Sequence, residues 1–87
     1  MPNLFVQLIK FRLHSVNVWI DTSMEESHDE GTRKWAIGVA CEEMAKIKDE
    51  LRTVGYATNM GERVLLGKRC FAEYLRTKKR LDGTLEN

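Results

Sequence analysis

The chain has 87 residues, of which 43% are hydrophobic and 31% are charged, and its net charge is +1. This size and composition indicate one small globular domain, 1–87, and exclude a disordered or low-complexity chain. Two cysteines are too few for a disulfide framework, and no CxxC or Cys/His cluster predicts a metal site. Because a domain this small gains limited stability from burial alone, we expect self-association into a homo-oligomer.

Residues 4–20 carry two competing patterns. Apolar and polar residues alternate over 9–14 and again over 16–21, and the β-branched Val16, Val18 and Ile20 favour a strand. The rival pattern is a polar stripe at helical spacing, formed by Asn3, Gln7, Lys10, His14, Asn17 and Asp21. We favour an extended β segment over about 4–20, so the fold class that we expect is α-rich α+β. The alternative is an all-α three-helix protein.

Two helices are predicted after this segment. The stretch Ser23–Glu26 has the S-x-x-E form of a capping box, which predicts a helix start near residue 24. Apolar residues at steps of three and four then form a seam, and Gly55 is placed as the helix stop. The seam consists of Ile37, Ala40, Met44, Ile47, Leu51 and Val54.

The second helix is expected to begin after Asn59, a cap residue, and to end near Leu81. Its expected inward residues are Val64, Phe71, Tyr74, Leu75 and Leu81, with Leu66 and Cys70 alongside. The two helices, about 24–54 and 60–81, are similar in length and joined by a short connection, as an antiparallel helical hairpin requires. We expect this hairpin to be completed by self-association.

No set of residues predicts catalysis. Cys41 and Cys70 lie on or beside the apolar seams, where a buried thiol is ordinarily inert. His28 lies in an acidic turn, and no glycine-rich phosphate loop is present. We therefore expect no enzyme activity, no cofactor and no metal site.

The charge is distributed unevenly along the chain. Residues 22–52 carry eight acids and five bases, whereas residues 62–80 carry seven bases and two acids. Several bases fall on one side of the expected second helix, and others alternate along the expected strand. The candidates for binding nucleic acid or phosphate are Lys10, Arg12, His14, Lys68, Arg69, Arg76, Lys79 and Arg80. The alternative interpretation is a solvated surface that balances the acidic half.

A strand followed by two helices, with Lys10, Arg12 and His14 on one face of the strand, resembles in outline the ribbon-helix-helix DNA binders. In that family a two-stranded ribbon formed across a dimer enters the major groove. The first helix expected here is longer than in that family, so the resemblance is one of order and charge.

The function that we expect first is that of a small non-catalytic interaction or regulatory protein that binds and modulates another macromolecule, as inhibitors and adaptors do. Its candidate interface residues are Trp19, Trp35, Phe71 and Tyr74. The alternatives are a nucleic-acid-binding regulator and a binder of a small phosphorylated ligand at a basic subunit interface. The first residues lack the positive n-region of a signal peptide, and Lys10 and Arg12 interrupt their apolar run, so we expect a cytoplasmic protein with no membrane partner.

Overall fold

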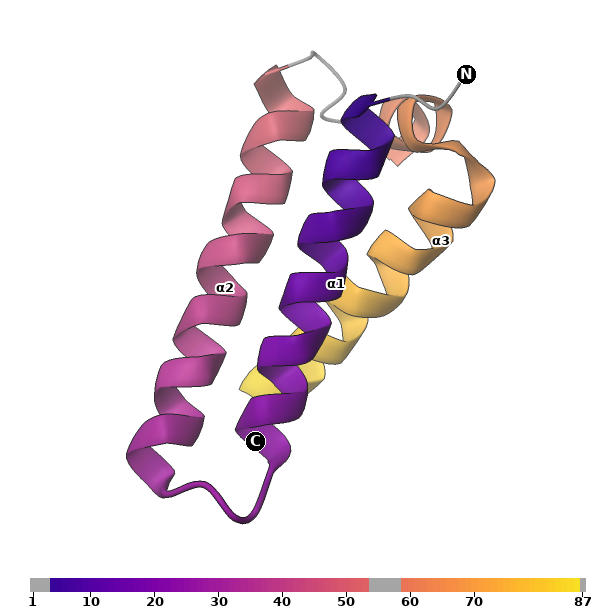
Figure 1. Cartoon of the computed structure of the whole chain (residues 1–87). Helices are drawn as coiled ribbons and strands as arrows, with labels where there is room; N and C mark the ends of the chain where they lie inside the picture. The colour runs from indigo at the N-terminus through magenta and orange to yellow at the C-terminus, as the bar shows by residue number, and fades with distance from the viewer. Residues whose placement is uncertain (1–3, 54–58, 87) are drawn as a thin grey trace.

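The computed structural model describes residues 4–53 and 59–86, apart from the side chains of residues 59, 60 and 62. Over this part the chain consists of three α-helices and contains no strand (Figure 1). The helices are α1 (Leu4–Met24), α2 (Glu30–Thr53) and α3 (Asn59–Leu85). The expected β segment over 4–20 is therefore wrong, and the all-α three-helix alternative is confirmed. Because residues 4–20 form no strand, the expected α+β fold is wrong, and so is the resemblance to the ribbon-helix-helix DNA binders.

The helical conformation of α1 follows from what its residues bury. Ile9, Leu13, Val16 and Ile20 recur at steps of four, three and four, and all four are fully buried. Val16 and Ile20 lower the intrinsic helix propensity by about 0.5 kcal/mol each. Burial of each side chain contributes about 1.5–3 kcal/mol, so packing outweighs propensity. The alternating pattern over 9–14 is misleading. A strand would place Ile9 and Phe11 on the same face, whereas in the helix Ile9 is buried and Phe11 is exposed.

The turn between α1 and α2 lies later than the predicted capping box. Ser23 belongs to the last turn of α1, where its hydroxyl donates a 2.6 Å hydrogen bond to the carbonyl of Ile20. The residue that caps α2 is Asp29, whose Oδ1 accepts a 2.7 Å bond from the amide of Thr32. Bonds from the side chain and the amide of Thr32 hold the pKa of the Asp29 carboxyl below its usual value.

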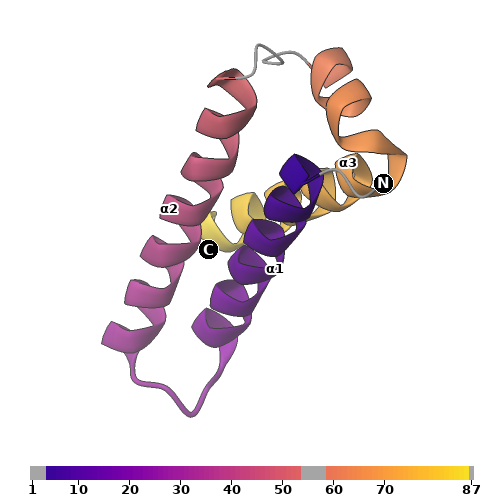
Figure 2. The ribbon, with the colours of Figure 1, turned by 45° about the horizontal axis from the view of Figure 1, so that its top comes forward.

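The helix pairs differ from the predicted hairpin. α1 and α2 run antiparallel and share the most extensive packing. α3 passes behind α1 at an angle, with its last turns towards α2, and α2 and α3 meet least (Figures 1 and 2). The expected antiparallel pairing of 24–54 with 60–81 is therefore wrong, because α1 takes the place beside α2. The predicted helix stop at Gly55 and the outer seam residue Val54 lie outside the described residues.

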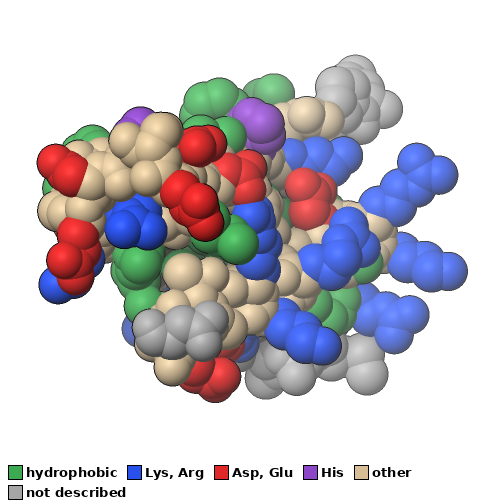
Figure 3. Space-filling model, turned by 90° about the horizontal axis from the view of Figure 1, so that it is seen from below, with side chains coloured by type: hydrophobic (Ala, Val, Ile, Leu, Met, Phe, Trp, Pro, Cys, Tyr) green, Lys and Arg blue, Asp and Glu red, His purple; other side chains and the backbone are tan. Residues whose placement is uncertain are grey.

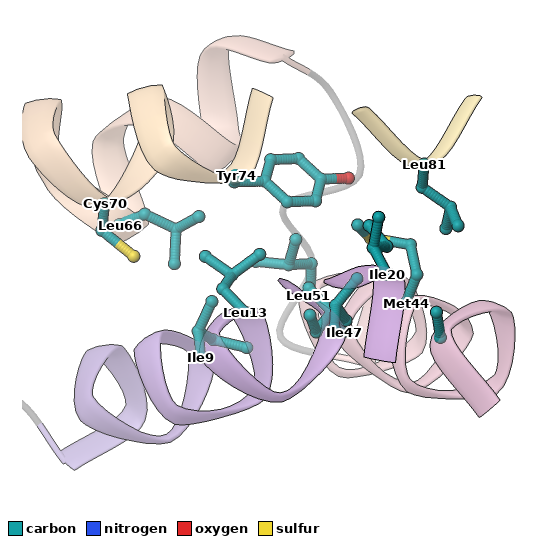
Figure 4. Close-up of a cluster of buried hydrophobic side chains, with 12 residues drawn as sticks. Ile9, Leu13, Ile20, Met44, Ile47, Leu51, Leu66, Cys70, Tyr74 and Leu81 are labelled. Atoms are coloured by element: carbon teal, nitrogen blue, oxygen red, sulfur yellow. The ribbon is translucent and has the colours of Figure 1, made fainter. Parts of the chain in front are cut away.

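The core lies where the three helices converge on α1 (Figure 4). It consists of Ile9, Leu13, Val16, Ile20, Ala40, Met44, Ile47, Leu51, Leu66, Cys70, Tyr74 and Leu81. The Cα radius of gyration is 13.7 Å, compared with about 12 Å for a compact chain of this length. The bundle is thus elongated, and its stability depends on a narrow core.

The buried stripe of α3 lies to one side of the predicted one. Leu66, Cys70, Tyr74 and Leu81 are buried, whereas Val64 is 70% exposed. The inward positions of Tyr74 and Leu81 were predicted correctly, but those of Val64 and Leu75 were wrong, and Phe71 is half-buried. Thr77 explains the error, because this polar residue occupies a buried position in the true stripe. Its Oγ1 accepts a 2.9 Å bond from Asn17 Nδ2 of α1, which removes the cost of burying the hydroxyl.

Gly67 interrupts α3. Its φ of 81° and ψ of 164° lie far from helical values, and α3 bends visibly in Figure 2. This backbone conformation is essentially restricted to glycine. The bend separates a short first segment from the longer second segment that packs against α1.

We predict opposite effects of alanine at two glycines. Gly67→Ala should lower the free energy of unfolding by about 1–3 kcal/mol, because the φ/ψ region excludes a Cβ. Gly38→Ala, in the middle of α2, should raise it by up to about 1 kcal/mol. An added Cβ meets no atom within 4 Å at either position, so only backbone conformation differs. Urea denaturation measures the free energy of unfolding of both variants. Equal stabilisation by the two substitutions would show that α3 continues as a regular helix through Gly67.

Candidate interaction surfaces

No group of three or more His, Cys, Asp or Glu residues that could hold a metal ion occurs in the part of the chain that the structure describes. Cys70 is buried and Cys41 is half-buried, and both thiols are free. Burial raises the pKa of the Cys70 thiol, the Glu73 carboxylate raises it further, and the charge of Lys10 opposes the rise.

Arg12 joins α1 to α2. Its Nη2 lies 2.7 Å from Glu50 Oε1, and its Nη1 lies 3.6 Å from Glu43 Oε2. All three side chains are largely shielded from water, so their mutual attraction is screened less than that of an exposed pair. Arg12, a predicted phosphate-binding candidate, is thus engaged within the fold.

Arg80 is the corresponding residue between α3 and α1. It forms an ion pair with Asp21, and its Nη1 donates a 3.0 Å bond to Asn17 Oδ1. Asn17 in turn donates to Thr77 and to the carbonyl of Leu13, so it connects the two helices from a half-buried position. Arg80 therefore positions α3 on α1, and its guanidinium is occupied.

The other predicted bases remain at the surface. Lys10, His14, Lys68, Arg69, Arg76 and Lys79 are exposed, and none forms a hydrogen bond or ion pair with another described residue. Lys68, Arg69 and Arg76 line a shallow depression of about 600 Å³, together with Ala72 and Glu73. Viewed from below, Lys and Arg side chains project together on the side of the molecule where α3 lies (Figure 3). The structure thus separates Arg12 and Arg80, which are paired within the fold, from exposed bases on α1 and α3 that are not.

A second surface was not predicted from the sequence. Leu4, Leu8, Phe11 and Val18 are 82%, 40%, 72% and 44% exposed, and they form what we call the outer row of α1. Their steps of four, three and seven place them on one side of the helix, opposite the buried stripe. Lys10 and Arg12 point to either side of this row, since each residue turns the helix by about 100°. The spacing was present in the sequence, but the expectation of a strand concealed it.

The predicted interface residues have different surroundings. The ring centroids of Trp19 and Trp35 lie 5.1 Å apart at 84°, an edge-to-face contact that joins α1 to α2. Trp35, which belongs to α2, remains 60% exposed beside Trp19. Phe71 is half-buried against the core, and Tyr74 is only 3% exposed within it. Trp35 therefore lies at the surface, Trp19 packs half-buried against the core, and Tyr74 holds α3 in place.

No family model, curated protein or solved structure matches the chain. None of the described helices is long and apolar enough to span a membrane.

We predict that the two thiols differ in reactivity. At neutral pH a maleimide should label the half-buried Cys41 first, whereas Cys70 should react only as the chain unfolds, because burial both shields its thiol and raises its pKa. Intact-mass measurements over time give the two rates, and Cys41→Ser isolates the slower one. Equal labelling rates in the folded protein would contradict the placement of Cys70 in the core.

Proposed function

We propose that the protein is a small non-catalytic interaction protein that binds other protein chains through the outer row of α1. The observation that carries the proposal is the exposure of Leu4, Leu8, Phe11 and Val18 along one side of a helix. Single exposed apolar residues are ordinary, but a contiguous row flanked by polar residues is typical of a docking surface. Trp35, which contacts Trp19 of α1, is a second exposed aromatic residue of the type that is enriched at binding hot spots.

The spacing of the row favours a helical partner. Apolar residues at steps of three and four form the seam with which one helix packs against another. The small Ser15 lies between Phe11 and Val18, so a partner side chain can enter the row there. A second copy of the chain carries the same seam, and we propose it as the first partner.

The position of α1 in the bundle supports binding at low conformational cost. Its inner face is fixed by the core and its edges by Arg12 and Asn17, so the outer row is held in helical form before any partner arrives. A preformed surface loses little conformational entropy on binding. Such a surface suits an inhibitor or adaptor, because these proteins modulate a partner by covering part of the partner's surface.

We predict that Phe11→Glu weakens self-association while Val64→Glu does not. Phe11 and Val64 are similarly exposed, at 72% and 70%, but Val64 lies on the first segment of α3. A charge buried in the centre of an interface costs about 2 kcal/mol or more, so the dissociation constant should rise at least ~30-fold for Phe11→Glu. Sedimentation equilibrium measures both variants, and unchanged helical content by circular dichroism shows that each one folds.

Two results would contradict the proposal. A wild-type chain that stays monomeric at micromolar concentration would exclude the second copy as partner. A photoreactive amino acid at position 11 that captures no more protein from a host extract than the same group at position 64 would exclude the outer row as a binding surface altogether.

A further inference from the structure

Four exposed bases lie on the outer side of α3, and we call them the basic row. It consists of Lys68, Arg69, Arg76 and Lys79. Positions 69, 76 and 79 are separated by seven and three residues, so they follow one side of the helix, with Lys68 adjacent. At 1.5 Å per residue the row extends about 16 Å along α3.

Some cations elsewhere in this fold are paired with carboxylates. Arg12, Lys34, Lys46 and Arg80 each lie within reach of a carboxylate. Glu73 is the acidic residue that lines the depression beside the basic row, where Lys68, Arg69 and Arg76 outnumber it. The row therefore presents a net positive charge to solvent, separate from the acidic residues of α2.

The shape of this surface favours an extended anion. The depression between Lys68, Arg69 and Arg76 has Ala72 in its floor, so a ligand can approach the helix closely. It is shallow and lined mainly by long charged side chains, whereas sites for small molecules are concave and mostly apolar. A chain of phosphates satisfies several of these bases at once, which a single phosphate cannot do across 16 Å or so.

The surroundings of the basic row favour a double-stranded over a single-stranded nucleic acid. Single-stranded nucleic acids are held by stacking of bases on aromatic side chains. The nearest aromatics of α3 are unsuited to this, since Tyr74 lies in the core and Phe71 packs against it. Arg and Lys without aromatic neighbours are the residues that contact the sugar-phosphate backbone of a duplex.

We infer that the basic row binds the phosphate backbone of double-stranded DNA without sequence specificity. Lys68, Arg69, Arg76 and Lys79 each contact a phosphate. The row spans about five phosphates of one strand, at 3.4 Å per phosphate along the duplex axis. Arg12 and Arg80 take no part, because both are held by carboxylates within the fold. This surface is distinct from the outer row of α1, so the two binding activities are separable.

Fluorescence anisotropy with a labelled duplex of mixed sequence tests the inference across a salt series. Four phosphate contacts predict a slope of about −3.6 in a plot of log affinity against log salt. Between about 50 and 200 mM salt the affinity should therefore fall roughly 150-fold. Arg69→Ala/Arg76→Ala should reduce the slope to about −1.8. Lys48→Ala/Arg52→Ala removes the same charge from exposed positions on α2 and should leave the slope unchanged.

Other outcomes would overturn the inference. The first two are absence of duplex binding at about 50 mM salt and an equal loss of affinity in the two double variants. The others are tighter binding of a single strand than of the duplex, and binding of polyglutamate that is as tight as binding of the duplex. Phe11→Glu should retain the slope of the wild-type chain, which separates failure of this inference from failure of the proposed interaction through α1. Circular dichroism of each variant confirms that the helices are intact.

Discussion

The structure depends on the burial of one face of α1 between the other two helices. Ile9, Leu13, Val16 and Ile20 are fully buried there, and each removes an apolar side chain from water at a gain of about 1.5–3 kcal/mol. Because α1 contacts both neighbours, α2 and α3 need little direct contact with each other, which explains the elongated form of the bundle. Polar contacts at the two edges of α1 then fix the arrangement, through Arg12 towards α2 and Asn17 towards α3.

The same arrangement determines which surfaces are free. A helix that lies between two others has a third side that no element of the bundle covers, and on α1 this side carries apolar residues. Two carboxylates of α2, those of Glu43 and Glu50, contact Arg12 of α1, whereas the outer side of α3 carries bases without carboxylate partners. The face on α1 that we propose for protein binding and the face on α3 that we propose for anion binding are thus both left free by one packing scheme. They use separate residues, so each proposed activity can be tested without the other.

The sequence predicts some of this structure well and the remainder poorly, for physical reasons. Ala40, Met44, Ile47 and Leu51 were predicted as one buried seam, because a helix with one apolar side leaves a clear three-and-four spacing. In α1 both the buried side and the outer row are apolar, so that spacing is obscured and the alternation over 9–14 dominates. The paired and unpaired bases could not be separated from the sequence, because the carboxylates that engage Arg12 and Arg80 lie 38 and 59 residues away along the chain.

Amide hydrogen exchange measured by NMR tests the central role of α1 most directly. If α1 is the helix about which the core forms, the amides from Leu13 to Ile20 should be among the slowest to exchange, with protection close to that of global unfolding. The first segment of α3, before Gly67, should exchange much faster. Fast exchange over Leu13–Ile20, alongside strong protection of a pairing between α2 and α3, would contradict the account and favour the hairpin that the sequence predicted.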